Sequence, residues 1–189
     1  MPIVPIDDGN RVAAQRVFTR AFHDDPLVRW VMADPERDPA LWRFSDVHRS
    51  PGASDLYVDG DGRTVGAAWW DPPGYQPDVD HRRMVVQALR VLRTRVMRGA
   101  AIEELFPKYR PREPHWYLST IGAVEQGRGI GSALLAHRLE QIDGPAYLES
   151  SNRVNIPLYE KFGFTVVDEV RLPMNGPSFW PMYRPETRG

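Results

Sequence analysis

Residues Gln126 to Ile142 read QGRGIGSALLAHRLEQI and join a glycine-rich turn to an amphipathic helix. Glycines occupy alternate positions, Gly127, Gly129 and Gly131, at the point where the helix has to begin. Inside a helix, each glycine is about 0.5–1 kcal/mol less favourable than alanine. Because this loss falls where a helix must nucleate, the glycines indicate a role other than helix stability.

The glycine turn follows a segment, His115–Val124, that has the pattern of a central strand. A strand, a glycine-rich turn and a helix N-terminus together form an arrangement that binds phosphate. The first N–H groups of a helix have no internal partner and lie at the positive end of its dipole, and glycines let a ligand approach the backbone. A tight turn that only packs the helix on a sheet is the alternative, and the turn alone does not decide between the two.

The glycine spacing excludes two common nucleotide-binding motifs. The glycines run G-x-G-x-G with no lysine after them, so the segment is neither a phosphate loop nor a dinucleotide-binding turn. It does match Q-x-x-G-x-G through Gln126, Gly129 and Gly131. In this it resembles the acetyl-CoA signature of the GCN5-related N-acetyltransferase (GNAT) family.

A second segment, Asn152–Phe164, reads NRVNIPLYEKFGF and resembles the asparagine, tyrosine and Gly-Phe segment of the same family. The sequences HWYLSTIG before the glycine turn and LESS before Asn152 extend the resemblance, which is closest to the puromycin N-acetyltransferase-like branch. It covers residues 114–184 well, and in residues 1–113 it rests on element order and on AFHDDP at Ala21–Pro26. One difference is a strand-to-loop segment, Ile121–Gln126, that is shorter than the family usually has.

Length and composition indicate one folded domain over residues 1–189, and the resemblance implies an acetyl-CoA-binding core at about 114–184. Apolar residues make up 42% and charged residues 26% of the chain, as in ordinary globular proteins. A net charge of −1 favours neither nucleic acid nor an anionic membrane as a partner. The chain has no cysteine, which excludes disulfides and a covalent acetyl-cysteine route. Without a secretory signal or a long apolar run, we expect a cytoplasmic protein.

The hydrophobic periodicity predicts an α/β (α+β) fold with a mixed sheet flanked by helices, and the resemblance implies that this sheet is splayed. Helices are expected over Asn10–Phe22, Pro26–Met32, Asp38–Arg49, Val79–Met97, the segment after the glycines, and Asn155–Phe162. Gly99 is expected to end the longest helix, with a short helix through Phe106 and a connector from Pro107 to Pro114. Strands are expected over Asp55–Asp59, Thr64–Trp70, His115–Val124, Ala146–Ser151, Phe164–Leu172 and Ser178–Arg184, the last two paired.

The resemblance implies a site for acetyl-CoA as co-substrate and assigns residues to it. The backbone around the turn would hold the pyrophosphate, with Arg128 adding a charged contact, and the strand edge before it would bind the pantetheine arm. Asn155 and Tyr159, one helical turn apart, would bind the arm and protonate the departing thiolate. The full set is Ile121, Gly122, Ala123, Val124, Gln126, Gly127, Arg128, Gly129, Ile130, Gly131, Ser132, Asn155 and Tyr159. Core packing is the alternative for Tyr159, a solvated charge is the alternative for Arg128, and helix capping is the alternative for Asn152.

The acceptor amine must lose a proton, so a carboxylate or a water-linked base is expected. Glu149 is the first candidate because it stands on an otherwise apolar and small-residue strand; a structural carboxylate is its alternative role. His115, Asp24 and Asp25 are further candidates for the base. We expect no metal.

The predicted function is transfer of an acetyl group to a small-molecule primary amine by direct attack in a ternary complex, with a homodimer as a possible assembly. Three alternatives are a non-catalytic CoA-binding or sensing module, acetylation of a peptide or protein amine, and nucleic-acid binding through the arginines at positions 82, 83, 90, 93, 95 and 98. Those arginines lie largely off the apolar stripe, which favours a solvated face over nucleic-acid binding.

Overall fold

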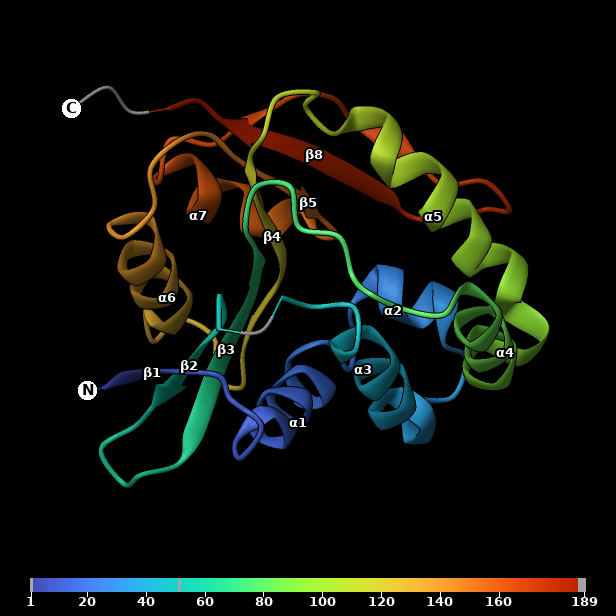
Figure 1. Cartoon of the computed structure of the whole chain (residues 1–189), viewed down its shortest axis with the longest axis horizontal. Coiled ribbons are helices and arrows are strands. Elements are labelled where there is room, and N and C mark those ends of the chain that lie inside the picture. Colours follow the sequence, from blue (N-terminus) through green and yellow to red (C-terminus); the bar gives the residue numbers. More distant parts are fainter. Residues whose placement is uncertain (1, 51, 187–189) are drawn as a thin grey trace.

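The computed structural model describes residues 2–50 and 52–186, which form a twisted mixed sheet with helices on both faces (Figure 1). The strand order is β1-β2-β3-β4-β5-β8-β6, and β7 pairs with β8 off this path. Only the β4–β5 pair is parallel within the described residues. The strands are β1 (Ile3–Pro5), β2 (Asp55–Val58), β3 (Thr64–Asp71), β4 (Trp116–Ala123), β5 (Ala146–Ser150), β6 (Thr165–Val166), β7 (Val170–Arg171) and β8 (Ser178–Arg184). The predicted helix-flanked mixed α/β sheet is confirmed.

Two hydrophobic clusters fill the two faces of the sheet. On one face, α6 (Ile130–Leu139) and α7 (Ile156–Glu160) pack against Leu118, Leu148 and Met182. On the other face, Phe18 and Trp69 lie at the centre of a cluster that also receives the remaining long helices. These helices are α1 (Arg11–Ala21), α2 (Pro26–Val31), α3 (Asp38–Asp46), α4 (His81–Leu92) and α5 (Val96–Tyr109).

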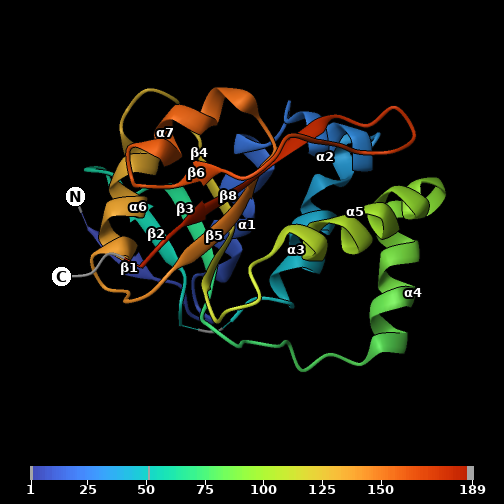
Figure 2. The ribbon, with the colours of Figure 1, turned by 90° about the horizontal axis from the view of Figure 1, so that it is seen from above.

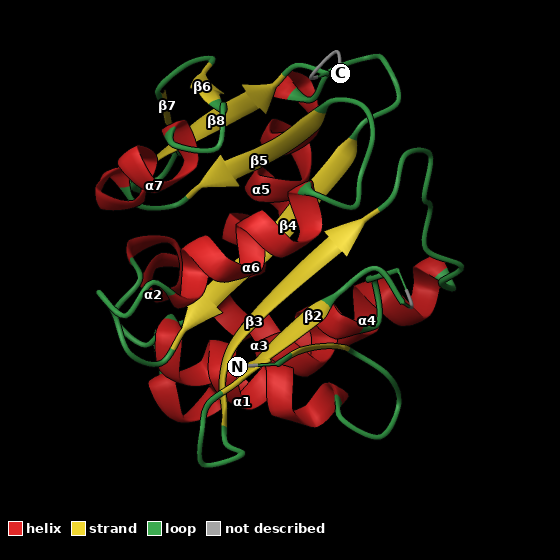
Figure 3. Cartoon of the chain, turned by 90° about the vertical axis from the view of Figure 1, so that its left-hand side faces the viewer, coloured by secondary structure: helices red, strands yellow, loops and turns green. Residues whose placement is uncertain are grey.

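The central strands β4 and β5 diverge, which confirms the predicted splay (Figure 3). Their parallel pairing covers only Trp116–Leu118 and Ala146–Leu148, although β4 continues to Ala123 and β5 to Ser150. Beyond Leu118 the edge of β4 that faces β5 therefore has no β5 partner within the described residues. We call this opening, between Ser119–Ala123 and the end of β5, the wedge.

The prediction of a single long helix over Val79–Met97 is wrong. Helix α4 ends at Leu92, Arg93 takes a φ of 51°, and α5 starts at Val96 after the 3-10 turn Arg93–Arg95. Gly99 does not stop this helix but lies inside α5, where the absence of a side chain leaves room for Leu92. The short helix predicted through Phe106 is likewise part of α5, which runs to Tyr109 and so takes in the first three residues of the predicted connector Pro107–Pro114.

Helix α4 stands at the far end of the molecule from β1 (Figure 2), and most of its apolar stripe is not buried. Val85 and Leu89 are 43% and 49% exposed, whereas Leu92 is buried. Arg95 and Arg98 are not part of a solvated face, because both donate to the carbonyl of Trp30 at 2.8 Å. These two arginines connect α5 to the end of α2.

Smaller differences concern short elements. Strand β1 was not predicted, the helix expected over Asn155–Phe162 is the 3-10 turn Arg153–Asn155 followed by α7, and the strand expected over Phe164–Leu172 is divided into β6 and β7. Both pieces pair with β8, so the predicted pairing of the last two strand regions is confirmed. Within the described residues, no helix has both the length and the apolar character needed to span a bilayer.

Candidate active site

The backbone of the turn explains two of its three glycines. Gly127 and Gly129 have φ values of 75° and 73°, in the left-handed region that costs other residues about 1–2 kcal/mol. Gly129 is the N-cap of α6. Gly131 serves packing instead, because a Cβ there would lie 3.3 Å from the Leu158 side chain.

The same turn leaves the N-terminus of α6 free to bind an anion. No side chain caps the helix, so the first N–H groups have no protein partner from a capping residue. A Cβ at Gly127 or Gly129 would meet no atom within 4 Å, so a ligand can reach this backbone. Arg128 is 69% exposed and makes only a loose ion pair with Glu125, at 3.7 Å. This cradle fits a pyrophosphate group.

A β-bulge shapes the wedge. Trp69 is paired with Thr120 and Trp70 with Leu118, so Ser119 is an extra residue on β4. The bulge changes which residues face each side of the sheet. Ile121 and Ala123 join Leu118 in the α6 cluster, whereas a Cβ at Gly122 would contact Phe18 on the opposite face.

The exposed edge of β4 fits an extended ligand such as the pantetheine arm. The predicted contacts Ile121, Gly122 and Ala123 all lie in the part of β4 that has left β5. The N–H of Val124 is already used, because it donates to the Val65 carbonyl at 2.9 Å. Any contact from Val124 would have to use its carbonyl.

Tyr159 is buried on α7 within the cluster that contains Leu118 and Leu148. Burial, with the negative charge of Asp25, raises the pKa of the Tyr159 hydroxyl, so this hydroxyl is a neutral, protonated phenol. Asn155 is exposed and lies just before α7, one turn from Tyr159. Asn152 is a cap, as its side chain accepts from the N–H of Val154 at 3.1 Å.

The loop between α1 and α2 joins the end of β5 through Asp25. One carboxylate oxygen of Asp25 accepts from the N–H groups of Leu27 and Val28, at 2.9 and 3.0 Å, and caps α2. The other oxygen accepts from the Ser151 hydroxyl at 2.6 Å. Asp25 therefore lies at the end of the wedge, whereas the neighbouring Asp24 is exposed.

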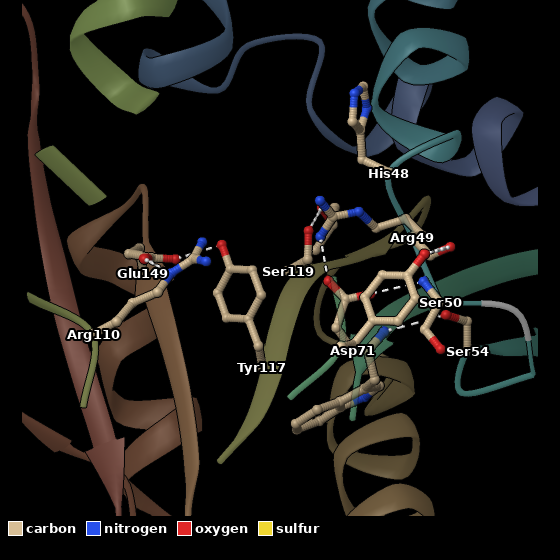
Figure 4. A network of polar contacts seen from close by, with 12 residues as sticks. His48, Arg49, Ser50, Ser54, Asp71, Arg110, Tyr117, Ser119 and Glu149 are labelled. Carbon is tan, nitrogen blue, oxygen red and sulfur yellow. Dashed lines mark hydrogen bonds and ion pairs between the residues drawn. The ribbon is translucent and has the colours of Figure 1, made fainter. Parts of the chain in front are cut away.

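Glu149 is the first residue of β5 beyond its last pair with β4, and it lies on the opposite sheet face from Leu148 and Tyr159. Its side chain is only 2% exposed. Oε2 accepts from the Tyr117 hydroxyl at 2.7 Å, and Oε1 accepts from Nε of Arg110 at 3.5 Å (Figure 4). Burial raises the pKa of Glu149, although Arg110 and the hydroxyl of Tyr117 oppose this rise.

Sequence reasoning missed Tyr117 and Arg110. One signal was available for Tyr117: aligning the two apolar strands at Leu118 and Leu148 places Tyr117 beside Tyr147, as the structure has it. Arg110 follows α5 and had no comparable signal.

A second polar group continues along the same face, with Ser119 between it and Tyr117 (Figure 4). Asp71 on β3 is paired with Tyr117 in register, and it accepts from Arg49 and from the N–H of Ser50, both at 2.8 Å. Burial raises the pKa of Asp71, against the charge of Arg49.

The candidate base His115 lies outside the wedge. His115 precedes β4, at the end of the strand away from the wedge, and its ring contacts the Glu113 carbonyl at 2.8 Å. In the described parts of the chain, no group of three or more His, Asp or Glu side chains is arranged to hold a metal ion.

Comparisons with known proteins agree with this fold. A Corynebacterium glutamicum protein described as histone acetyltransferase HPA2 and related acetyltransferase has a TM-score of 0.72 at 24% identity, covering 99% of this chain and 97% of its own. Arylalkylamine N-acetyltransferase 2 from Aedes aegypti has a TM-score of 0.65 at 11% identity, covering 97% and 98%. A Drosophila melanogaster polyamine N-acetyltransferase that forms N-acetylagmatine has a TM-score of 0.58 at 13% identity, covering 97% and 100%.

At these identities the solved structures establish a common fold. The sequence itself goes further, because residues 18–164 match the profile of the acetyltransferase (GNAT) family. That match spans most of the chain and includes the glycine turn, the wedge and Tyr159. The chain therefore belongs to the acetyltransferase (GNAT) family, whose members take the acetyl group from acetyl-CoA.

Proposed function

We propose that this acetyltransferase transfers the acetyl group to the primary amine of a small molecule, by direct attack in a ternary complex. The observation that carries the proposal is the wedge. It runs from the uncapped N-terminus of α6 to a buried phenol, Tyr159, with the carboxylates Asp25 and Glu149 at its borders. Holding the amine and the thioester in one such opening supplies the proximity that a bimolecular reaction lacks.

In this proposal the backbone amides of Gly127–Ser132 hold the pyrophosphate and the edge Ile121–Val124 holds the pantetheine arm, with Asn155 beside it. Support comes from the free helix N-terminus and from the β4 edge that β5 leaves unpaired. We further propose that residues 1–189 act as one domain with its acetyl-CoA-binding core at about 114–184.

The chemistry needs an acid for sulfur and a base for nitrogen. Tyr159 donates a proton to the departing thiolate, a role supported by its neutral, buried phenol. Glu149 remains our first candidate for the base, and Asp25 is the second, because its carboxylate reaches Ser151 at the end of β5. The chain has no cysteine, so an acetyl-cysteine intermediate is excluded, and we propose that the amine itself attacks the thioester.

The aromatic side chains on the sheet face where Glu149 lies belong to the hydrophobic core, so the proposal of a small amine as acceptor draws its support from the names of the fold relatives. Phe18, Trp42 and Trp69 pack there, with Phe18 and Trp69 ring centroids 4.5 Å apart. Fold relatives are named as acting on arylalkylamines and polyamines, which makes both classes worth testing. The similarity to the puromycin branch, the cytoplasmic location and the homodimer stay predictions of the sequence.

The test measures the free CoA thiol that is released from acetyl-CoA when each of a panel of amines is added, and identifies the acetylated product by mass spectrometry. The panel contains arylalkylamines, polyamines, an aminonucleoside and a lysine peptide, because one fold relative is named as a histone acetyltransferase. The proposal predicts turnover with at least one small amine and little with the peptide. Turnover with the peptide alone would move the assignment to protein amines, and CoA binding without turnover on the whole panel would indicate a sensing module.

A further inference from the structure

Glu149 stands where the two reactants would meet. It is the residue at which β5 separates from β4, and across the opening the first unpaired residue of β4 is the bulged Ser119. A carboxylate at this point is near the proposed thioester site but on the opposite sheet face from Tyr159. In the proposed reaction Glu149 therefore serves the amine nitrogen, and Tyr159 serves the thioester sulfur. What keeps Glu149 functional there is a separate question, because its side chain is almost fully buried.

A buried carboxylate remains ionised only if other groups compensate for lost solvation. Two side chains from different elements do so. Tyr117 of β4 donates to Oε2 at 2.7 Å, and Arg110, which follows α5, donates to Oε1 at 3.5 Å. The Arg110 guanidinium also lies 4.0 Å from the centre of the Tyr117 ring, so the three side chains form one connected group.

The two oxygens of Glu149 are held differently. Oε2 has a short bond from Tyr117, whereas the contact from Arg110 to Oε1 is long, and the Arg110 side chain is 36% exposed. Tyr117 therefore fixes the orientation of the carboxylate, and Oε1 is the oxygen with capacity to accept a further proton. Arg110 supplies the positive charge on the more accessible side.

Further aromatic and charged side chains on this sheet face interact with the group formed by Glu149, Tyr117 and Arg110. Tyr147, on the same strand as Glu149, stacks on Tyr117 with ring centroids 6.2 Å apart and interacts with the carboxylate. Burial raises the pKa of Tyr117, and the positive charge of Arg49 opposes this rise. The positive charge of Arg110 likewise opposes the rise that burial causes in the pKa of Asp71. On the other side of β5, the register partner of Glu149 is Pro181, which carries no charge. Arg110 is thus the cation that contacts Glu149 directly within the described residues.

We propose that Arg110 and Tyr117 are positioning residues for Glu149, which together keep its carboxylate ionised and oriented to take the proton of the acceptor amine. The inference rests on the proposed function. The nitrogen lone pair forms the C–N bond, the C–S bond breaks with its electron pair leaving on sulfur, and the sulfur takes the Tyr159 proton. The N–H proton goes to Oε1 of Glu149, and both side chains exchange protons with solvent after product release.

The first test is the pH dependence of kcat/KM in Arg110→Gln and Arg110→Lys. The positive charge lowers the pKa of Glu149, so its removal raises that pKa and moves the acidic limb of the profile to higher pH. When the limb moves by about one pH unit, the rate on its acidic side falls about tenfold. Lysine keeps the charge and should restore the position of the limb. Arg112→Gln, at an exposed arginine two residues away, is the matched control.

The second test does not depend on turnover. In protein labelled with ¹³C at glutamate carboxyls, the Glu149 signal is assigned by its absence in Glu149→Gln, and its titration is compared among variants. Arg110→Gln and Tyr117→Phe should both raise the titration midpoint, with CoA affinity unchanged by calorimetry. Tyr117→Phe keeps the ring, so it provides the comparison if Arg110→Gln fails to fold.

The outcomes separate the two proposals. A wild-type protein that acetylates no amine overturns the proposed function, whatever the titrations show. A wild-type protein that is active, with an acidic limb and a Glu149 titration that neither variant moves, overturns the inference alone. Loss of rate at all pH values without a displacement of the limb would mean that the two residues only support the structure, which also overturns it.

Discussion

Replacing Gly129 with alanine separates the backbone role of the glycine turn from its role in binding. The residue has a φ of 73°, and a Cβ there would meet no atom within 4 Å, so the change strains the backbone without a clash. The left-handed conformation costs alanine about 1–2 kcal/mol, and the more restricted unfolded chain offsets roughly 0.4–1 kcal/mol of this. The expected destabilisation is about 1 kcal/mol, or a fall in Tm of about 2–4 °C.

Binding should suffer more than stability. Alanine favours negative φ, so the turn relaxes and at least one N–H group moves away from the pyrophosphate. A hydrogen bond to a charged group is worth about 1.5–3 kcal/mol, which corresponds to roughly 10- to 150-fold weaker binding of CoA. Calorimetric titration with CoA measures this directly. Thermal unfolding gives a second readout, since saturation at about 100 times Kd stabilises the wild type by about 2.7 kcal/mol.

The matched control is Gly144→Ala. Gly144 has a φ of 89°, its Cβ would also meet nothing within 4 Å, and it lies just before β5, outside the proposed site. Both variants should lose similar stability, and only Gly129→Ala should lose CoA affinity. Equal CoA affinity in the two variants would refute the assignment of the turn as the pyrophosphate site.

Substitutions at three other residues test separate parts of the site. Tyr159→Phe keeps the buried ring but removes the proton donor, so kcat should fall about 10²–10⁴-fold with CoA affinity little changed in calorimetry; an unchanged kcat would exclude the acid role. Because burial raises the pKa of Glu149 above 4.5, its contribution to folding is full below that pH and is lost as pH rises through the raised value. Glu149→Gln should therefore reduce the dependence of the unfolding free energy on pH between 4.5 and the raised pKa, as measured by denaturant titrations at several pH values. A pH dependence equal to that of the wild type would contradict the burial argument. Asp25→Ala should cost about 1 kcal/mol through loss of the α2 cap, whereas Asp25→Ser should retain most of that stability in thermal unfolding; equal losses would show that the cap is unimportant.

The half of the chain that carries the glycine turn was predictable because its signals are local. Positive φ at Gly127 and Gly129, the strand before them and the helix after them are encoded within a short segment. The splay of β4 and β5 was predictable only through the family resemblance. The strands separate after Leu118, next to a bulge at Ser119 that local sequence does not mark.

The α4–α5 region was mispredicted because a continuous apolar stripe does not show where a helix turns. Val85 and Leu89 fit the stripe yet are exposed, and the break falls at Arg93, a residue type without a preference for positive φ. Tertiary contacts decide the geometry, with Arg95 and Arg98 bound to the α2 end.

The polar groups of the site were only partly predictable for a similar reason. Glu149 and Asp25 could be proposed as single carboxylates, but their partners are distant in sequence. Tyr117 lies 32 residues from Glu149, and Ser151 lies 126 residues from Asp25. Such pairs depend on strand register and on loop placement, which a single sequence does not specify.

The most direct test of transfer in the wedge is a single-turnover experiment with acetyl-CoA labelled in the acetyl group and enzyme in excess, using the best amine from the panel. Direct attack predicts that the label moves from the thioester to the amine only when the amine is present, and that the protein itself never carries it. Label that remains on bound acetyl-CoA with every amine, or that accumulates on the protein before reaching the amine, would contradict direct transfer.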